Sequence, residues 1–220
     1  MNCKAILFDM DGVLIDSEAV MALSTVEALG HFGIRTKPED YFPFIGKGEE
    51  LYIGGVVRNH GFVYVPEMKA HTYDVYGKNI GAKDCIPGAA DMIRDVVRAK
   101  IPHALCSGAE LPKVLHNLRA LGLTTEDFNA ILSANDVTRN KPFPDIYLKG
   151  AAALGFAPEE CVVVDDTLAG VASGKAAGAY TIAIGGTYTA EQFREQGLAD
   201  AYVEKPAMLS AYFRSMGFDL

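Results

Sequence analysis

Tryptophan is absent from the 220 residues of the sequence, and cysteine occurs only four times. No two cysteines form a CxxC pair; they stand at Cys3, Cys85, Cys106 and Cys161. This spacing argues against a zinc-finger site and against a disulfide framework. In a reducing compartment we expect all four to be buried thiols.

Long apolar runs are also missing. No segment approaches the ~18 residues that a membrane-spanning helix needs. The apolar run near the start ends at Asp9, which is too early for the core of a secretory signal, and no small-residue cleavage site follows it. We therefore expect a cytoplasmic protein that has no membrane partner.

Basic residues are fewer than acidic ones: Lys and Arg number 20, Asp and Glu number 28, and the net charge is −8. A nucleic-acid binder usually has a basic surface, so we expect no nucleic-acid partner. Half of the residues are apolar and 22% are charged, which is typical of a folded chain with a core. The length predicts one large domain, or one domain with an insertion, and nothing in it demands more than a monomer.

Short apolar runs recur along the chain and read as strands, because they are bounded by Asp, Ser or Gly. They cover residues 5–8, 103–106, 129–133, 161–164 and 180–184. Helical patterns alternate with them over residues 89–100, 110–121 and 144–155. This alternation predicts an α/β fold with a doubly wound parallel sheet, whose ligands bind at the carboxyl ends of the strands.

The stretch between the first strand and residue 87 contains helical patterns but no clear strand. It predicts a helical cap domain at 17–86, inserted into a core domain made of 1–16 and 87–220. Apolar residues at helical spacing predict the buried helix faces. These are Val20, Leu23, Val26 and Leu29 in 18–32; Met92, Ile93, Val96 and Val97 in 89–100; and Leu111, Val114, Leu115, Leu118 and Leu121 in 110–121.

Acidic residues follow two of the predicted strands. Asp9 and Asp11 come after the first strand, and at that spacing both side chains can enter one pocket; a solvated turn is the alternative. Asp165 and Asp166 come after strand 161–164. Adjacent carboxylates that leave a buried strand are unfavourable unless a cation neutralises them. Oxygen ligands without His or Cys favour Mg²⁺ over zinc, although an ordinary acidic loop is the alternative.

Other polar residues follow the remaining strands. Ser107 and Gly108 come after strand 103–106 and before a helix, where a hydroxyl and free N–H groups bind anions; a plain helix cap is the alternative. Lys141 lies among prolines that stiffen the backbone, which suits a charge clamp, with a surface lysine as the alternative. Acids, a hydroxyl and a lysine that converge on one crevice suit phosphoryl transfer through an aspartyl intermediate.

The ordered set of these motifs resembles the haloacid dehalogenase-like (HAD) superfamily. The motifs are DMDGVLIDSE at 9–18, Ser107, KPFPDIY at 141–147 and DDTLAG at 165–170. The chain is most similar to the β-phosphoglucomutase-like and phosphatase subgroup, which carries a helical cap after the first strand. The predicted insertion at 17–86 lies where that cap is expected.

The resemblance implies a role for each matching residue. Asp9 would be the nucleophile that takes the phosphoryl group. Asp11 would be the general acid and then the base that activates water. Ser107 and Gly108 would bind the phosphoryl oxygens together with Lys141, which would also orient Asp9.

The resemblance also implies a Mg²⁺ site. Its ligands would be the side chains of Asp9 and Asp166 and the backbone carbonyl of Asp11. Asp165 would be a further partner, either directly or through water. Many relatives carry Glu where this chain has Asp165, so this contact departs from the family pattern.

The identity of a few residues separates the branches of the superfamily. Asp11 favours P–O chemistry, because the dehalogenase relatives lack an acid there. Mutase relatives tend to have His where Met21 stands and Arg near Glu49, and these departures favour hydrolysis. Lys47 is a candidate substrate contact in place of that Arg, although a plain surface lysine is the alternative.

We therefore expect a Mg²⁺-dependent phosphatase that acts on a small phosphomonoester, such as a sugar or polyol phosphate. A β-phosphoglucomutase-like enzyme is the first alternative. A phospho-acceptor receiver domain is the second and fits less well, since receivers are about half as long. A binder that has lost catalysis is disfavoured because no motif is broken.

The remaining polar residues are expected to lie outside the site. Lys100, Lys113 and Arg119 are predicted to face solvent. The five histidines form no cluster with ligand spacing, and His103 begins its strand, at the wrong end of the sheet. The tyrosines of the insertion are expected to pack the cap, with one or two facing the crevice: Tyr52, Tyr64, Tyr73 and Tyr76.

Overall fold

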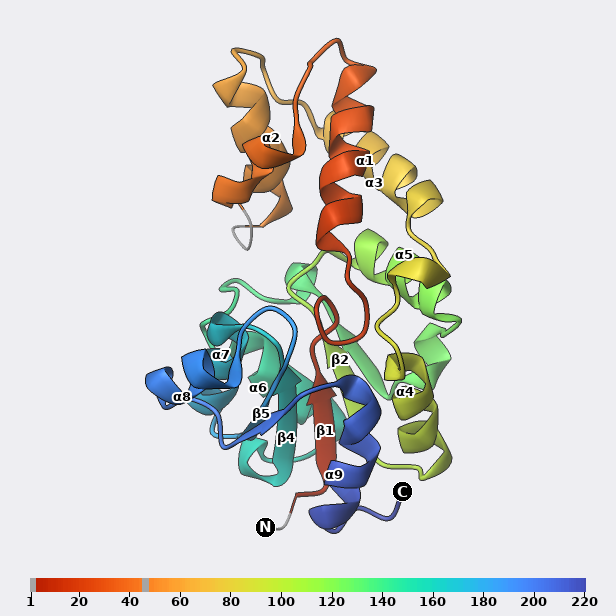
Figure 1. The fold of residues 1–220 in the computed structure, drawn as a ribbon, viewed down its shortest axis with the longest axis vertical. Coiled ribbons are helices and arrows are strands. Elements are labelled where there is room, and N and C mark those ends of the chain that lie inside the picture. Colours follow the sequence, from red (N-terminus) through yellow and green to blue (C-terminus); the bar gives the residue numbers. More distant parts are fainter. Residues whose placement is uncertain (1–2, 45–47) are drawn as a thin grey trace.

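A six-stranded parallel sheet forms the centre of the molecule, in the order β3-β2-β1-β4-β5-β6 (Figure 1). The computed structural model describes residues 3–44 and 48–220. The strands are β1 Ala5–Phe8, β2 His103–Cys106, β3 Ala130–Leu132, β4 Cys161–Asp165, β5 Tyr180–Ile184 and β6 Ala201–Val203. The doubly wound α/β fold is confirmed, and β6 is a strand that the sequence patterns did not predict.

Helices cover both faces of the sheet because alternate strand residues point to opposite sides. Ile6 and Phe8 of β1 belong to a core cluster that also holds residues of α4, α5 and α9. Ala5 and Leu7 belong to a second cluster, with residues of α6. These helices span Ala89–Arg98 (α4), Leu111–Leu121 (α5), Asp145–Leu154 (α6) and Leu209–Ser215 (α9); α7 spans Leu168–Ala177 and α8 Ala190–Gln196.

The residues between β1 and α4 form helices that lie beyond the carboxyl ends of the strands, at the top of Figure 1. They are α1 Glu18–Gly30, a 3₁₀ segment Pro38–Phe44, α2 Glu49–Asn59 and α3 Pro66–Asn79. We call the described residues of 17–86 the cap. The exact domain limits stay a prediction.

The two connections of the cap to the sheet run side by side. Ile15 forms an antiparallel bridge with Cys85. The backbone N–H of Asp16 donates to the carbonyl of Asp84 at 2.8 Å. The chain therefore leaves and re-enters the sheet through adjacent backbone segments.

The predicted faces of two helices are partly wrong. In α5, Leu111 and Leu115 are 43% and 45% exposed, whereas Lys113 and Asn117 are buried. In α1, Leu23 is 59% exposed. In both helices small or polar side chains occupy part of the buried face, so the apolar residues alone mark it poorly. The predicted buried face of α4 is confirmed: Met92, Ile93 and Val96 are buried and Val97 is partly buried.

All four cysteines are free, as predicted, but only Cys106 and Cys161 are buried. Cys3 and Cys85 are partly exposed. Within the described ranges, no helix combines the length and the apolar character that crossing a membrane requires.

Candidate active site

Asp9, Asp165 and Asp166 form a buried cluster at the carboxyl ends of β1 and β4. Carboxylate oxygens of the three lie within 4.8 Å of one another. The two strands are neighbours, and Phe8 pairs with Val164, so the residues that follow them meet. The structure therefore brings together three of the residues that the sequence singled out.

Lys141, in the loop before α6, lies between two of these carboxylates. Its Nζ is 2.6 Å from Oδ1 of Asp9 and 2.8 Å from Oδ2 of Asp165. Burial by itself lowers the pKa of Lys141, but the Asp165 and Asp9 carboxylates outweigh it and the net pKa is raised. Lys141 is therefore a charged side chain within the cluster, not a surface lysine.

Protein donors hold both oxygens of Asp165. Tyr147 donates its hydroxyl to Oδ2 at 2.6 Å. Thr167 donates its backbone N–H and its hydroxyl to Oδ1, at 2.9 and 2.8 Å. The sequence patterns did not assign roles to Tyr147 or Thr167. The signal for Thr167 is its position as N-cap of α7, where its hydroxyl accepts from the N–H of Gly170.

Asp166 is bound less completely. Thr187 donates its hydroxyl to Oδ2, while Oδ1 is buried and has no hydrogen-bond donor among the described residues. Burial, reinforced by the neighbouring Asp165, raises the pKa of Asp166 to about 7. A Cβ at Gly12, where φ is +79°, would lie 2.0 Å from Oδ2 of Asp166, so the turn after β1 packs directly on this carboxylate.

The donor set of this cluster fits a hard divalent cation. It offers carboxylate oxygens without His or Cys, which suits Mg²⁺. Burial raises the pKa of Asp9 well above its usual range, and Asp165 and Asp166 add to the rise against the opposing effect of Lys141. With all three carboxylates ionised, the cluster would carry more negative charge than Lys141 neutralises, and the buried Oδ1 of Asp166 lacks a donor among the described residues.

Asp11 lies beside the cluster and is held mainly by α5. Its Oδ1 accepts from the hydroxyl of Ser17 and from Nδ2 of Asn117, the latter at 3.1 Å. Its Oδ2 is 3.0 Å from Nζ of Lys113. The prediction that Lys113 faces solvent is wrong, because Lys113 is buried against Asp11. The prediction for Arg119 is confirmed, since Arg119 is exposed; its guanidinium also donates to the carbonyl of Gly77 in the cap.

Ser107 and Gly108 lie in the loop between β2 and α5. Ser107 is fully buried, and its Oγ accepts from the N–H of Ala109 at 3.1 Å. It is not the N-cap of α5, a position held by Glu110. Gly108 lines the same cavity as Asp9 and Asp11. Lys47 lies outside the described residues.

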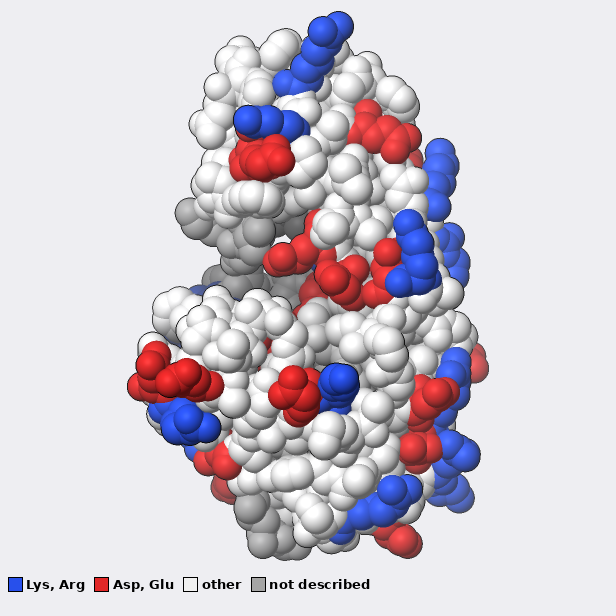
Figure 2. Space-filling view, in the orientation of Figure 1, with Lys and Arg blue, Asp and Glu red and all other residues white. Residues whose placement is uncertain are grey.

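A cavity of about 860 Å³ separates the cap from the carboxyl ends of the strands. Its polar wall includes Asp9, Asp11, Lys113, Lys141 and Asp166. Its cap wall includes Met21, Leu23, Phe42, Phe44 and Tyr52. Tyr52 is thus a cap tyrosine that faces the crevice, as expected. The space-filling view shows acidic side chains along one side of the hollow between cap and sheet (Figure 2).

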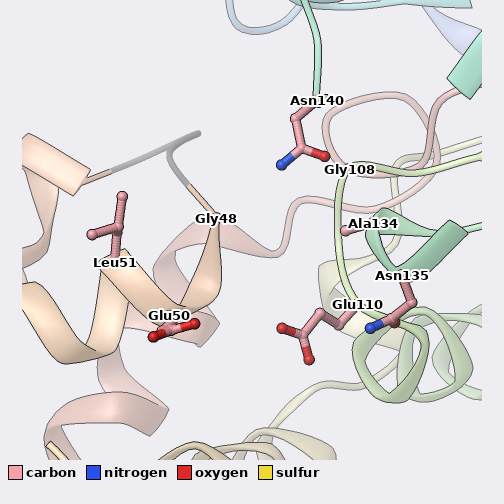
Figure 3. A pocket seen from close by; sticks show the side chains of 8 residues that line it. All are labelled: Gly48, Glu50, Leu51, Gly108, Glu110, Ala134, Asn135 and Asn140. Atoms are coloured by element: carbon pink, nitrogen blue, oxygen red, sulfur yellow. The ribbon is translucent and has the colours of Figure 1, made fainter. Parts of the chain in front are cut away.

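A smaller cavity of about 450 Å³ adjoins this site and shares Gly48, Gly108 and Asn140 with it. Figure 3 shows the side chains of Glu50, from α2, and Glu110, before α5, on facing sides of it. Nζ of Lys69 in α3 lies 2.8 Å from Oε1 of Glu110. The rim of the site therefore carries carboxylates from both the cap and the sheet side.

Comparison with known proteins agrees with this geometry. A family model described as haloacid dehalogenase-like hydrolase matches residues 3–178. The protein SUPPRESSOR OF QUENCHING 1, chloroplastic, from Arabidopsis thaliana is 34% identical over 199 residues, which are 88% of this chain but 19% of that protein. The chain thus spans about a fifth of that relative. Hexitol phosphatase A from Escherichia coli (strain K12) is 32% identical over 185 residues, 84% of each chain.

A solved structure of a related protein has a similar fold. The crystal structure of CbbY from Rhodobacter sphaeroides in complex with phosphate has a TM-score of 0.82 and 28% identity, covering 94% of this chain and 96% of that one. The family model covers most of this chain. The chain therefore belongs to the haloacid dehalogenase-like hydrolases.

Proposed function

We propose that this chain is a Mg²⁺-dependent phosphatase that hydrolyses a small phosphomonoester, of the sugar or polyol phosphate class, through an aspartyl phosphate. The observation that carries the proposal is the contact of Asp9 with Lys141 inside a buried carboxylate cluster that faces a cavity. The similarity to hexitol phosphatase A supports the substrate class.

Asp9 is the nucleophile in this proposal. Lys141 holds its Oδ1 and keeps the carboxylate fixed toward the cavity. Attack on phosphorus transfers the phosphoryl group to Asp9 and expels the leaving oxygen. In this proposal Ser107, Gly108 and Lys141 bind the phosphoryl oxygens, through a hydroxyl, backbone N–H groups and a positive charge. Gly108 and Lys141 line the cavity, and Ser107 directly precedes Gly108.

Asp11 protonates the leaving oxygen and then takes a proton from the water that hydrolyses the aspartyl phosphate. Its carboxylate lines the same cavity as Asp9. The aromatic and aliphatic wall of the cap, around Phe44 and Tyr52, restricts bulk water near the reacting atoms.

Asp9, Asp166 and the backbone carbonyl of Asp11 would hold Mg²⁺. When bound, this ion would offset the repulsion between the anionic nucleophile and the phosphoryl oxygens. Both oxygens of Asp165 already accept from protein groups, which favours a contact with the metal through water. The main task of Asp165 is then to orient Lys141.

Hydrolysis is favoured over a mutase reaction by the cap wall. Met21 is buried and lines the cavity at the position where mutase relatives tend to have His. Its thioether neither accepts nor delivers a proton in this reaction. Lys47 remains a candidate contact for the leaving group.

A screen for phosphate release over many phosphorylated sugars and polyols, with Mg²⁺, tests this function. We expect turnover in the parent chain and its loss in EDTA. Asp9→Asn should lower kcat at least about a thousandfold, because the amide is a poor nucleophile. Asp91→Asn, at an exposed position of α4, is the matched control and should keep parent activity. Equal turnover of Asp9→Asn and the parent would contradict the assignment of the nucleophile.

A further inference from the structure

We propose that Lys113 and Asn117 of α5 are positioning residues for Asp11, and that Tyr76 of the cap sets the orientation of Asn117. The proposal rests on the proposed function, in which Asp11 exchanges a proton with the leaving oxygen. It connects the cap helix α3 to the reacting carboxylate through a chain of hydrogen bonds between side chains.

The first step in this series of hydrogen bonds is the contact of two α5 side chains with Asp11. Lys113 and Asn117 are four residues apart and lie on the same face of the helix. Lys113 contacts Oδ2 of Asp11 at 3.0 Å, and Nδ2 of Asn117 donates to Oδ1 at 3.1 Å. Ser17 donates to Oδ1 as well. Both carboxylate oxygens are therefore fixed, and the side chain has little freedom to rotate.

The second step is the orientation of the Asn117 amide. Asn117 is fully buried, so its polar atoms need partners within the protein. Tyr76 donates its hydroxyl to Oδ1 of Asn117 at 2.5 Å, which leaves Nδ2 to face Asp11 and the sulfur of Met10. The opposite orientation would place Oδ1 against the Asp11 carboxylate, acceptor against acceptor.

The third step is the consequence for the reaction. A general acid must lie within hydrogen-bond reach of the oxygen that it protonates, and small displacements reduce the rate strongly. Asp11 and Lys113 both line the cavity with Asp9. Tyr76 lies on α3, which belongs to the cap. The position of Asp11 thus depends on Tyr76, a cap residue that is fully buried and is not among the residues that line the cavity.

The test compares two esters that differ in their need for an acid. An alkyl phosphate, such as the best polyol phosphate of the screen, expels an alkoxide that needs a proton. 4-Nitrophenyl phosphate expels a phenolate that needs little help. For Tyr76→Phe and for Lys113→Met we expect kcat on the alkyl ester to fall about tenfold, roughly the worth of one hydrogen bond, with KM little changed. The kcat on the aryl ester should stay within about twofold of the parent.

Arg119→Gln is the matched control. Arg119 also joins α5 to α3, through the carbonyl of Gly77, but it makes no contact with Asp11 among the described residues. In Arg119→Gln, kcat on each ester should stay within about twofold of the parent value. Lys113→Arg restores a cation at the same position and should recover most of the alkyl activity.

Several outcomes would overturn the positioning role. One is an equal fall of kcat on both esters in Tyr76→Phe and Lys113→Met. Another is the same selective loss in Arg119→Gln, which would point to general loosening of the cap. A rise in KM alone for Lys113→Met would make Lys113 a substrate contact instead. A parent chain that releases phosphate from neither ester would overturn the proposed function itself, and the positioning role with it.

Discussion

Lys141 lies between Asp9 and Asp165 with 12% of its side chain exposed. Removing one partner of a buried ion pair leaves uncompensated charge, so Lys141→Met should lower the free energy of unfolding by about 3 kcal/mol at pH 7. Urea unfolding of the metal-free protein measures this. Lys175→Met is the control: its partner is Asp200, and both side chains are partly exposed, at 37% and 28%. We expect a loss below about 1 kcal/mol there, and equal losses would contradict the prediction.

The residues of the carboxylate cluster could be predicted because their positions follow from local sequence. Asp9 and Asp166 each follow an apolar run that ends at the same edge of a parallel sheet. Lys113 and Asn117 could not be predicted in this way. They are polar residues on the buried face of α5. Their burial is explained by contacts with Asp11 and Tyr76, which are distant from α5 in the sequence.

A contact between two histidines could not be predicted from the sequence either. Nδ1 of His31 lies 2.6 Å from Nε2 of His71, although the two are 40 residues apart and no spacing suggested a pair. The contact arises because α1 packs against α3. The expectation for His103 is confirmed, since it is the first residue of β2 and lies at the far end of that strand from the site.

Among the elements, α7 shows how tightly the site is packed. A Cβ at Gly170 would lie 1.8 Å from Oδ2 of Asp165. Gly170→Ala should therefore destabilise the protein by about 2 kcal/mol, by overpacking, and lower phosphate release. Thermal unfolding and the phosphate assay measure the two effects.

Gly30→Ala is the control for this substitution. Gly30 is the last residue of α1, and a Cβ there meets nothing within 4 Å. Alanine is the better helix former, so we expect the control to be stabilised by up to about 1 kcal/mol. A Gly170→Ala protein as stable and active as the parent would mean that α7 and Asp165 are less closely packed than the structure indicates.

Element positions could be predicted better than helix faces. The first five strands and the starts of α4, α5 and α6 follow from apolar runs bounded by turn residues, whereas the sequence patterns gave no bounds for α7, α8 and α9. β6 has three residues between Asp200 and Glu204, too few for a clear pattern. In α5, Val114, Leu118 and Leu121 are buried as predicted, but Leu111 and Leu115 are exposed while Lys113 is buried. Hydrophobicity alone therefore predicted only part of the buried face.

At the scale of the whole molecule, the carboxylate cluster should make stability depend on pH and on Mg²⁺. Burial raises the pKa of Asp9 and of Asp166, for Asp166 to about 7. Between pH ~5 and ~7, above the usual carboxyl pKa range, the folded protein keeps protons that the unfolded chain has released. The free energy of unfolding should therefore fall as pH rises, by at most about 1.4 kcal/mol per pH unit for each retained proton.

Urea unfolding of the EDTA-treated protein across this pH range measures the slope. The pKa of His116 is lowered mainly by burial, so this residue makes the free energy of unfolding rise with pH near pH 6.5. The parent is therefore compared with Asp166→Asn, in which the dependence of the free energy of unfolding on pH should be weaker. Mg²⁺ at about 100 times its Kd should add roughly 2.7 kcal/mol to the parent at pH 7.5. A metal-free parent that becomes more stable from pH 5 to 7, or that does not respond to Mg²⁺, would rule out this electrostatic picture.

The paired connections at Ile15 and Cys85 have a consequence for how such a protein can diversify. Because the segment between them begins and ends at neighbouring backbone positions, a segment of different length or shape can take its place without displacing β1 or the acids behind it. The large apolar side chains on the cap side of the cavity, Met21, Leu23, Phe42, Phe44 and Tyr52, belong to this exchangeable segment. New substrates can thus be acquired by recombination in this segment, provided that the incoming segment still holds Asp11 and Asn117 as Ser17 and Tyr76 do.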